Sequence, residues 1–285
     1  PRGRGSVASL RDMAPFSVSL MLTDLISTFY MKLPQFFLGK LYPTATLGAF
    51  DQAVKLKDMP VTAATQSVQS VTFPALSEVR GDAPKFAESY RQVVLITAYV
   101  MFPAMLGLSA VAHDLFALLL SEKWMPTVPY FEVVCLAGLF YPVGMICYNV
   151  LKVMSRGPLI VRLEVVKKLL MTVVFAVTIP HSVMAVVWGL VVIAFGEMAV
   201  NFLATRRFTR FTTRRFLRTL LPVALVSGTM YLLVRLTACA VPGHLLLRLA
   251  AQLLVGAAAY VGLSVLFRLE AFGLLCDLMK KQAAR

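Results

Sequence analysis

Long apolar runs alternate with short polar segments along most of the chain. Runs such as VVWGLVVIAF lack the apolar–polar alternation at every second residue that is typical of transmembrane β-strands. A helix of about 20 residues crosses the apolar core of a bilayer and satisfies its own backbone hydrogen bonds there. The pattern therefore predicts an all-α polytopic membrane protein with about eight transmembrane helices. The predicted spans are residues 14–38, 46–76, 92–119, 130–151, 160–179, 183–204, 219–238 and 246–267.

The composition supports a membrane protein. Hydrophobic residues make up 59% of the 285 residues and charged residues only 15%, and the mean hydropathy is +0.77. Soluble domains average about 45–50% apolar and about 25% charged residues, so the composition argues against a disordered chain or a water-soluble globule. The formal net charge of +14 would also suit a nucleic-acid-binding protein, but the cations lie in short clusters between apolar runs. We interpret the run RRFTRFTTRRFLR at residues 206–218 as a patch beside the membrane that faces anionic headgroups, and we expect no nucleic-acid partner.

The cations are distributed unevenly between the two sets of alternating loops. One set carries 21 Lys and Arg residues and the other carries 3. Loops rich in Lys and Arg stay on the cytoplasmic side of a membrane, so both ends of this chain are predicted to be cytoplasmic. The chain begins PRGRGS, without Met, and we expect it to be a fragment that starts inside a cytoplasmic loop of a longer protein. The predicted parts are a cytoplasmic segment (1–13), six helices (14–204), a basic cytoplasmic loop (205–218), two further helices (219–267) and a cytoplasmic tail (268–285).

The first two predicted spans carry charges and amides at membrane depth. At 3.6 residues per turn, Asp24, Lys32 and Gln35 fall on one stripe of the first span, about 80° wide. A similar stripe on the second span holds five candidate residues, with Lys57 off the stripe. These five are Asp51, Lys55, Asp58, Gln66 and Gln69.

A charge at the bilayer centre costs at least about 2.5–3.5 kcal/mol, so such residues face a protein interior or a watery cavity. Two aligned polar stripes predict one shared cavity. The alternative is a set of internal salt bridges that only lock the helices together, since Lys55 can reach Asp51 and Asp58 on its own helix. The amides and hydroxyls on the stripes favour the cavity, because sugar hydroxyls need such partners.

Motifs for catalysis or metal binding are absent from the sequence. There is no HExxH, no Walker loop, no GxSxG and no CxxC, and the four cysteines are interpreted as packing residues. We therefore expect no enzyme activity, no cofactor and no metal. Asn149 and Lys152 end the fourth span on the cytoplasmic side. We interpret the cations that begin the fifth span mainly as a solvated helix start, although together with Lys152 they could still attract a phosphate from the cytoplasmic leaflet.

Four stretches of the chain resemble a known family. They are MAPFSVSLMLTDLISTFYMKLPQFFLG (13–39), LGAFDQAVKLKDMPVTAATQSVQSVTFPALSEV (47–79), LLSEKWMPTVPYFEVVCLAGLFYP (119–142) and NVLKVMSRGPLIVRLEVVKK (149–168). In order and spacing they resemble the polysaccharide-transporter (Wzx-like) flippases of the MOP superfamily, especially the WzxC-type lipopolysaccharide biosynthesis branch. The resemblance covers about residues 10–205. It implies two six-helix lobes around a central cavity plus two C-terminal helices, so the eight spans fit the second lobe and the two additional helices.

The resemblance also implies a function. Such flippases move undecaprenyl-pyrophosphate-linked oligosaccharides across the bacterial inner membrane by alternating access. It implies that Lys32, Lys55 and Lys57 favour the anionic headgroup and that Gln35, Gln66 and Gln69 bind sugar. Asp24, Asp51 and Asp58 become candidates for coupling to a proton or sodium ion. Expected partners are the lipid-linked oligosaccharide, membrane lipids, and polysaccharide polymerase and chain-length proteins.

Two alternatives remain open from the sequence. A MATE-like, cation-coupled exporter of small molecules would have a more apolar and acidic cavity than one that contains Lys32 and Lys55. A polytopic glycan polymerase or ligase would carry a large periplasmic loop with Arg or His, whereas the predicted outer loops are short.

Overall fold

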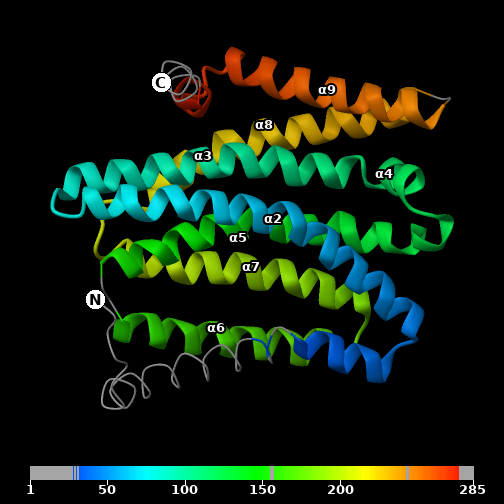
Figure 1. Cartoon of the computed structure of the whole chain (residues 1–285), viewed down its shortest axis with the longest axis horizontal. Coiled ribbons are helices and arrows are strands. Elements are labelled where there is room, and N and C mark those ends of the chain that lie inside the picture. The colour runs from blue at the N-terminus through cyan, green and yellow to red at the C-terminus, as the bar shows by residue number, and fades with distance from the viewer. Residues whose placement is uncertain (1–27, 29, 31, 155–156, 242–243, 276–285) are drawn as a thin grey trace, which may run out of the picture. The chain divides into compact units, whose positions relative to one another are not determined.

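The computed structural model describes the chain except residues 1–27, 29, 31, 155–156, 242–243 and 276–285. The chain divides into two compact units, residues 1–47 and 48–285. In the first unit, the described residues from 28 to 41 are helical. The second unit contains the helices shown in Figure 1, and the described residues form no strand. The helices are α2 (Thr44–Glu78, which starts at the end of the first unit), α3 (Ala83–Ala110), α4 (Ala112–Leu119), the 3-10 helix η1 (Glu122–Thr127), α5 (Val128–Val153), α6 (Gly157–Thr178), α7 (Val183–Thr205), α8 (Thr213–Ala240) and α9 (Leu245–Leu266).

The predicted all-α polytopic class is confirmed. Five described segments are long and apolar enough to cross a membrane: Ala83–Ala110, Glu122–Val153, Val183–Thr205, Thr213–Ala240 and Leu245–Leu266. Helices α2 and α6 are comparably long but carry several charged residues, such as Asp51 and Lys55 on α2. The count of eight spans stays a prediction.

One predicted span is wrong in its boundaries. Residues 92–119 are divided between α3 and α4, and α3 begins nearer the N-terminus, at Ala83. The Asp82 side chain accepts a hydrogen bond from the backbone N–H of Lys85 (3.1 Å) and so caps the helix, and this hydrogen bond holds the pKa of Asp82 below its ordinary value. At the other end, Val111 has φ −93° and ψ 3° and interrupts the helix. Hydropathy does not reveal this break because the flanking residues are apolar.

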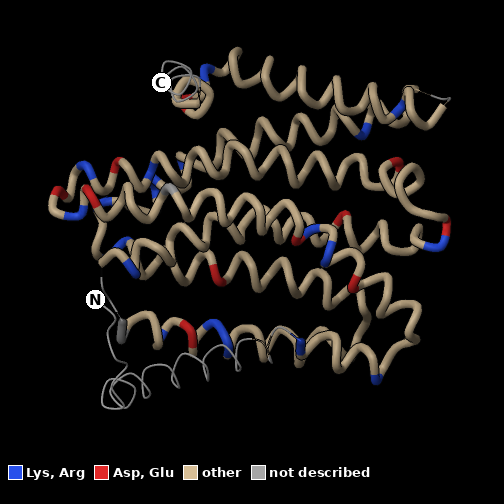
Figure 2. Tube along the Cα trace, viewed as in Figure 1, with Lys and Arg blue, Asp and Glu red and all other residues tan. Residues whose placement is uncertain are grey.

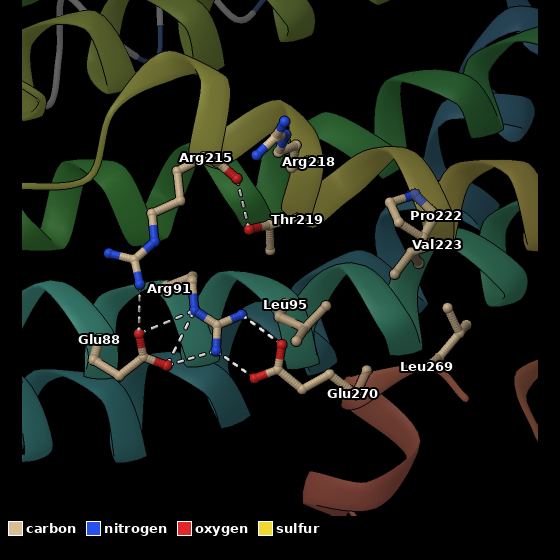
Figure 3. A pocket seen from close by; sticks show the side chains of 11 residues that line it. Glu88, Arg91, Leu95, Arg215, Arg218, Thr219, Pro222, Val223, Leu269 and Glu270 are labelled. Carbon is tan, nitrogen blue, oxygen red and sulfur yellow. Dashed lines mark hydrogen bonds and ion pairs between the residues drawn. The ribbon is translucent and has the colours of Figure 1, made fainter. Parts of the chain in front are cut away.

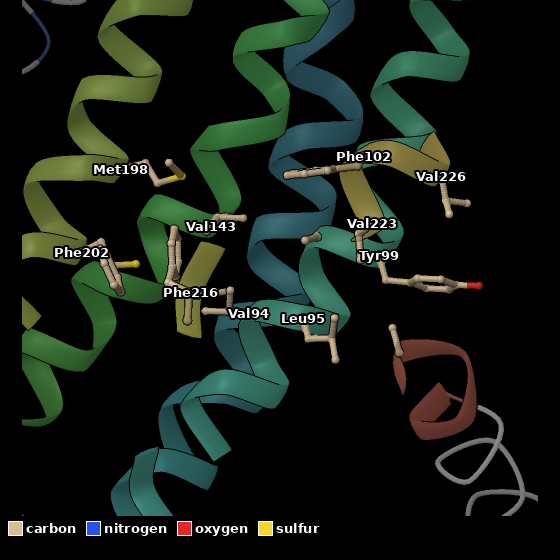
Figure 4. Packing of buried hydrophobic residues seen from close by; sticks show 14 of the residues in the cluster. Val94, Leu95, Tyr99, Phe102, Val143, Met198, Phe202, Phe216, Val223 and Val226 are labelled. Atoms are coloured by element: carbon tan, nitrogen blue, oxygen red, sulfur yellow. The ribbon is translucent and has the colours of Figure 1, made fainter. Parts of the chain in front are cut away.

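The long apolar helices pack in a fixed order. Helix α5 lies between α3 and α7, α3 also contacts α8, and α8 contacts α9, while α6 packs on α7. Figure 4 shows side chains from α3, α5, α7 and α8 that meet in the main apolar cluster, among them Phe102, Val143, Met198 and Val223. Farther along α2, Val61 packs against Met101 and Met105 of α3. The burial of apolar side chains between neighbouring helices is expected of helices that form one lobe of a membrane protein.

Charged residues lie near the ends of four of the apolar helices, α3, α5, α8 and α9, whereas α7 carries Glu197 within its length. Figure 2 shows that the middle sections of α3, α5, α8 and α9 carry none. The basic run predicted as a loop at 205–218 is partly helical, because α8 begins at Thr213. The Thr212 side chain caps α8 by accepting a hydrogen bond from the backbone N–H of Arg215 (3.4 Å). The last arginines of the run therefore project from the first turns of α8.

Candidate functional site

The predicted site residues of the first span and those of the second span belong to different units of the chain. Asp24 lies outside the described residues. Lys32 is exposed and Gln35 half-buried, and both belong to the first unit, residues 1–47. The remaining predicted residues lie on α2 in the second unit. The cavity shared by the first two spans stays a prediction.

The first half of α2 carries the charged part of the predicted stripe. Lys57, which the sequence pattern places off the stripe, forms an ion pair with its neighbour Asp58. Lys55 is exposed, and it forms no ion pair with another residue that the structure describes. The pairing of Lys55 with Asp51 or Asp58, which helical spacing allows, is therefore not the arrangement observed.

Asp51 differs from the other charged residues of α2. Its side chain is half-buried, and its Oδ1 atom is buried without a hydrogen-bond partner in the described part of the chain. A buried carboxylate oxygen without a hydrogen-bond partner is unfavourable. Among the described residues, no group of three or more His, Cys, Asp or Glu side chains is placed to hold a metal ion.

A polar pocket begins 15 residues beyond Asp51 on α2, at Gln66, which is about 22 Å at the 1.5 Å rise of a helical residue. The pocket has a volume of about 510 Å³ and is open on one side. Gln66, Gln69 and Ser70 line it from α2, and Asn149 and Lys152 line it from α5, together with Phe73. The structure thus brings Gln66 and Gln69 together in one pocket and leaves Asp51, Lys55 and Asp58 outside it.

Asn149 is the most constrained polar residue of this pocket. Its side chain is 3% exposed, and its Nδ2 atom is buried without a hydrogen-bond partner among the described residues. Leaving a buried amide donor unpaired costs about 1–3 kcal/mol, so this N–H group is available to donate to a ligand or a water molecule in the pocket. Helix α5 is otherwise strongly apolar around this residue, as the run LFYPVGMICYNVL shows.

Cations surround the same end of α5. The Lys152 ammonium lies 4.5 Å from the centre of the Tyr148 ring, and the buried Lys167 of α6 lies 5.1 Å from it. Lys167 also donates a hydrogen bond to Glu164. Lys152 is exposed and lines the pocket, so it is the one of these two lysines that a ligand in the pocket can reach.

Sequence reasoning assigned Gln66 and Gln69 to the site and missed Ser70 and Asn149. The two glutamines share a face of one helix, which periodicity detects. Asn149 was interpreted as a helix end, although a single amide in the apolar run of α5 was a usable signal. Its place in the same pocket as Gln69 depends on how α2 and α5 lie in the fold, and no pattern within one helix contains that information.

Comparison with known proteins supports the family resemblance. Residues 1–129 match the family described as polysaccharide biosynthesis protein. An uncharacterized membrane protein in the cps region of Klebsiella pneumoniae is 24% identical over 209 residues, which are 72% of this chain and 42% of that protein. The lipopolysaccharide biosynthesis protein WzxC of Escherichia coli K12 is 24% identical over 139 residues, 49% of this chain and 28% of its own length. The teichuronic acid biosynthesis protein TuaB of Bacillus subtilis is 22% identical over 130 residues, 46% of this chain and 27% of TuaB.

The fold resembles that of a solved flippase. The lipid II flippase MurJ, in an inward closed conformation, superposes with a TM-score of 0.71 at 14% identity, covering 90% of this chain and 55% of MurJ. The chain is therefore a multi-pass helical membrane protein with a MurJ-like fold. The predicted resemblance to polysaccharide biosynthesis proteins of the WzxC type is confirmed, and the fold is similar to that of a flippase. The chain spans less than half the length of the curated relatives it matches.

Proposed function

We propose that this chain forms part of a flippase that moves a lipid-linked oligosaccharide across the bacterial inner membrane for the synthesis of a surface polysaccharide. The relatives WzxC and TuaB are named for lipopolysaccharide and teichuronic acid biosynthesis, and MurJ for flipping lipid II. The proposed carrier is undecaprenyl pyrophosphate. Flipping moves a molecule without making or breaking a covalent bond, so the proposal assigns transport and no enzyme activity to the chain.

The observation that carries the proposal is the buried Nδ2 atom of Asn149, which lines a polar pocket on an otherwise apolar bundle and has no hydrogen-bond partner in the described part of the chain. In the proposal, the amides of Gln66, Gln69 and Asn149 bind sugar hydroxyls, and Lys152 attracts a phosphate. Neutral amides can donate and accept hydrogen bonds, which suits hydroxyl groups that also do both. The open side of the pocket admits a headgroup larger than the pocket itself, while the polyprenyl tail stays in lipid.

In the proposal, the charged part of α2 is a second binding site for the substrate headgroup. Asp51, Lys55 and Asp58 lie toward the outer end of α2 under the proposed orientation, in which the loop between α2 and α3 is cytoplasmic. Pro60 lies between this group and the pocket, and proline in a helix permits a bend because it removes one backbone hydrogen bond. Alternating access would then pass the headgroup from the pocket to Lys55 as the lobes rock.

We also propose roles for the first span, for the aspartates and for partner proteins. Lys32 and Gln35 contact the headgroup from the first span. Asp51 is the preferred coupling residue for a proton or sodium ion, because its Oδ1 atom has no protein partner among the described residues, with Asp24 and Asp58 as the other candidates. Polysaccharide polymerase and chain-length proteins would use the flipped product.

The test replaces pocket residues in cells that depend on this gene for surface polysaccharide. Gln66→Ala combined with Gln69→Ala, and separately Asn149→Leu, should each lower surface polysaccharide about ten-fold or more, because losing about 1.4 kcal/mol of substrate binding changes an equilibrium ten-fold. Polysaccharide is measured by gel staining, and membrane abundance of each variant by immunoblot. Ser67→Ala is the matched control, because Ser67 is exposed on the same helix and does not line the pocket.

Transport itself is then measured in vesicles that contain the purified protein and a fluorescent lipid-linked oligosaccharide. Slower flipping by the pocket variants, with Ser67→Ala unchanged, would agree with the proposal. Normal flipping by all of them would remove the pocket from the transport path. Normal flipping with reduced surface polysaccharide would place the defect after transport.

A further inference from the structure

A second pocket lies where the basic run meets α3. It has a volume of about 490 Å³ and is formed by α3, the first turns of α8 and residues 269–271, which follow α9. Figure 3 shows Arg215, Arg218 and Thr219 on the α8 side, opposite Arg91 and Glu270. All of these residues lie in the second unit, and none belongs to the pocket between α2 and α5.

Both carboxylates of this pocket are held by Arg91. The Arg91 guanidinium lies between them, with Nε 3.0 Å from Glu88 Oε1 and Nη1 2.8 Å from Glu270 Oε2 (Figure 3). The Arg91 side chain is only 12% exposed. The charge of Arg91 is therefore paired within the protein. Glu88 and Glu270, each paired with Arg91, repel an incoming anion less than free carboxylates would.

On the α8 side of the pocket, the positive charge of the arginines is only partly neutralised by the carboxylates of the pocket. Arg215 is half exposed and reaches Glu88 Oε2 at 3.3 Å, the longest of these contacts. Arg218 is exposed and makes no hydrogen bond or ion pair with another residue that the structure describes. The pocket contains three arginines against two carboxylates, so one positive charge is left over and it lies on α8.

The rest of the lining is apolar. Leu95, Pro222, Val223 and Leu269 continue the pocket away from the arginines, toward the apolar middle of α3 and α8. A pocket with a cationic rim and an apolar interior, at the end of membrane helices, matches a molecule with an anionic head and an apolar chain. A soluble anion would use only the rim.

We propose that this pocket binds the phosphodiester of an anionic membrane lipid, with Arg215 and Arg218 on the phosphate and an acyl chain along Pro222 and Leu269. Arginine suits this role because its planar guanidinium binds two phosphate oxygens at once and stays charged. The bound lipid joins α8 to α3 and to the segment after α9. The basic run thus contains one defined lipid site in addition to its general attraction to the membrane surface.

The experiment measures lipid retained by the purified chain in native mass spectrometry. The protein is extracted in detergent and exchanged into nanodiscs or micelles that contain phosphatidylglycerol or, in parallel, only phosphatidylcholine. Arg218→Gln should reduce the retained phosphatidylglycerol about ten-fold, and Arg215→Gln with Arg218→Gln should reduce it further. Arg214→Gln is the matched control, because Arg214 is an exposed arginine of the same run that does not line the pocket.

Folding is checked by thermal melting in phosphatidylcholine, where Arg218→Gln should match the wild type because the variant breaks no contact among the described residues. Phosphatidylglycerol should raise the melting temperature of the wild type and of Arg214→Gln more than that of Arg218→Gln. Equal loss of lipid from Arg218→Gln and Arg214→Gln would overturn the proposal in favour of diffuse attraction to the run. Competition with inorganic phosphate separates the two sources of the anion. Displacement of phosphatidylglycerol by phosphate at an equal concentration would show a free-phosphate site and overturn the lipid assignment.

Discussion

Gly144 marks a close approach of two membrane helices. A Cβ atom added at Gly144 of α5 would lie 3.2 Å from the Cα atom of Met198 on α7. At the same place, Asn201 donates a hydrogen bond from Nδ2 to the Gly144 carbonyl oxygen (3.3 Å). Apolar side chains gain little from leaving lipid, so close contact between membrane helices must supply the stability of their packing. Small residues such as glycine allow the helix backbones to approach closely enough for such contact.

Gly144→Ala should therefore destabilise the protein although alanine favours a helix. The new methyl group meets backbone, which cannot rotate away, and overpacking of this kind costs about 1–3 kcal/mol. Thermal melting in detergent should show a lower melting temperature for Gly144→Ala. Gly228→Ala on α8 is the control, because no atom lies within 4 Å of its added Cβ, and its melting temperature should not fall. A melting temperature for Gly144→Ala equal to that of Gly228→Ala would show that α5 and α7 separate freely.

In the candidate site, the sequence alone predicts which residues share a face of one helix, but it does not predict which residues meet between helices. Gln66 and Gln69 lie together because they are three residues apart on one helix, and that spacing is fixed by helix geometry. The ion pair of Lys57 with Asp58 was not expected, because a helical projection compares directions and ignores how far a flexible lysine reaches. Asn149 joins the glutamines only through packing of α5 beside α2.

At the scale of elements, the α8–α9 hairpin is bound to the rest of the second unit by specific polar contacts. Arg248 of α9 forms a two-pronged ion pair with Asp114 of α4. Arg235 of α8 contacts Glu132 of α5 at 2.9 Å. The Tyr260 hydroxyl donates a hydrogen bond to the Tyr99 carbonyl oxygen (2.7 Å). We expect the two additional helices to move with α3 and α5 as one body.

The two ion pairs should differ in their contribution to stability. Asp114 is almost fully buried, with a side-chain exposure of 4%, and Arg248→Met leaves its charge without a strong partner. Breaking a buried pair on one side costs about 3–5 kcal/mol, and Arg248 is partly exposed, so we expect a value near the lower end. Arg235→Met should cost about 1 kcal/mol or less, because Arg235 and Glu132 are both partly exposed to solvent or headgroups.

The measurement is unfolding of each variant by a denaturing detergent. The double variant Asp114→Leu with Arg248→Met is the control, and it should recover most of the lost stability because no charge is left buried. An unchanged single variant, or a double variant as weak as Arg248→Met, would contradict the assignment of this pair as the main polar tether of the hairpin.

The sequence predicts the elements themselves well where they are long, apolar and separated by polar residues. The bounds of α5, α7 and α9 agree with the predicted spans within a few residues. The error at residues 92–119 arises because Ala110, Val111 and Ala112 give no composition signal for the break between α3 and α4. A helix boundary set by backbone geometry alone is invisible to hydropathy.

At the scale of the whole molecule, the charge asymmetry makes a prediction about orientation. The loops predicted to be cytoplasmic carry 21 Lys and Arg residues against 3 on the other side. In the structure, the charged residues of α3, α5, α8 and α9 lie near the helix ends, and the middle sections of these helices carry none (Figure 2). The loop charges assign one end of the helices to the cytoplasm. The pocket near Gln66 and the proposed lipid site would then both face the cytoplasmic leaflet.

Cysteine labelling in cells tests this orientation directly. Gly81 lies in the turn between α2 and α3, with no atom within 4 Å of an added Cβ, and His181 is exposed in the turn between α6 and α7. Each is changed to cysteine in a background without Cys239 and Cys276, while Cys135 and Cys147 stay because they are buried. A membrane-impermeant maleimide should label His181→Cys in intact spheroplasts and Gly81→Cys only after permeabilisation. The reverse labelling would place the amide pocket at the outer leaflet, where a flippase would release its cargo, and loading would have to begin at Lys55. Labelling of both sites in sealed spheroplasts would contradict the assignment of α3, α5 and α6 as three crossings, an odd number that places these two turns on opposite faces of the membrane.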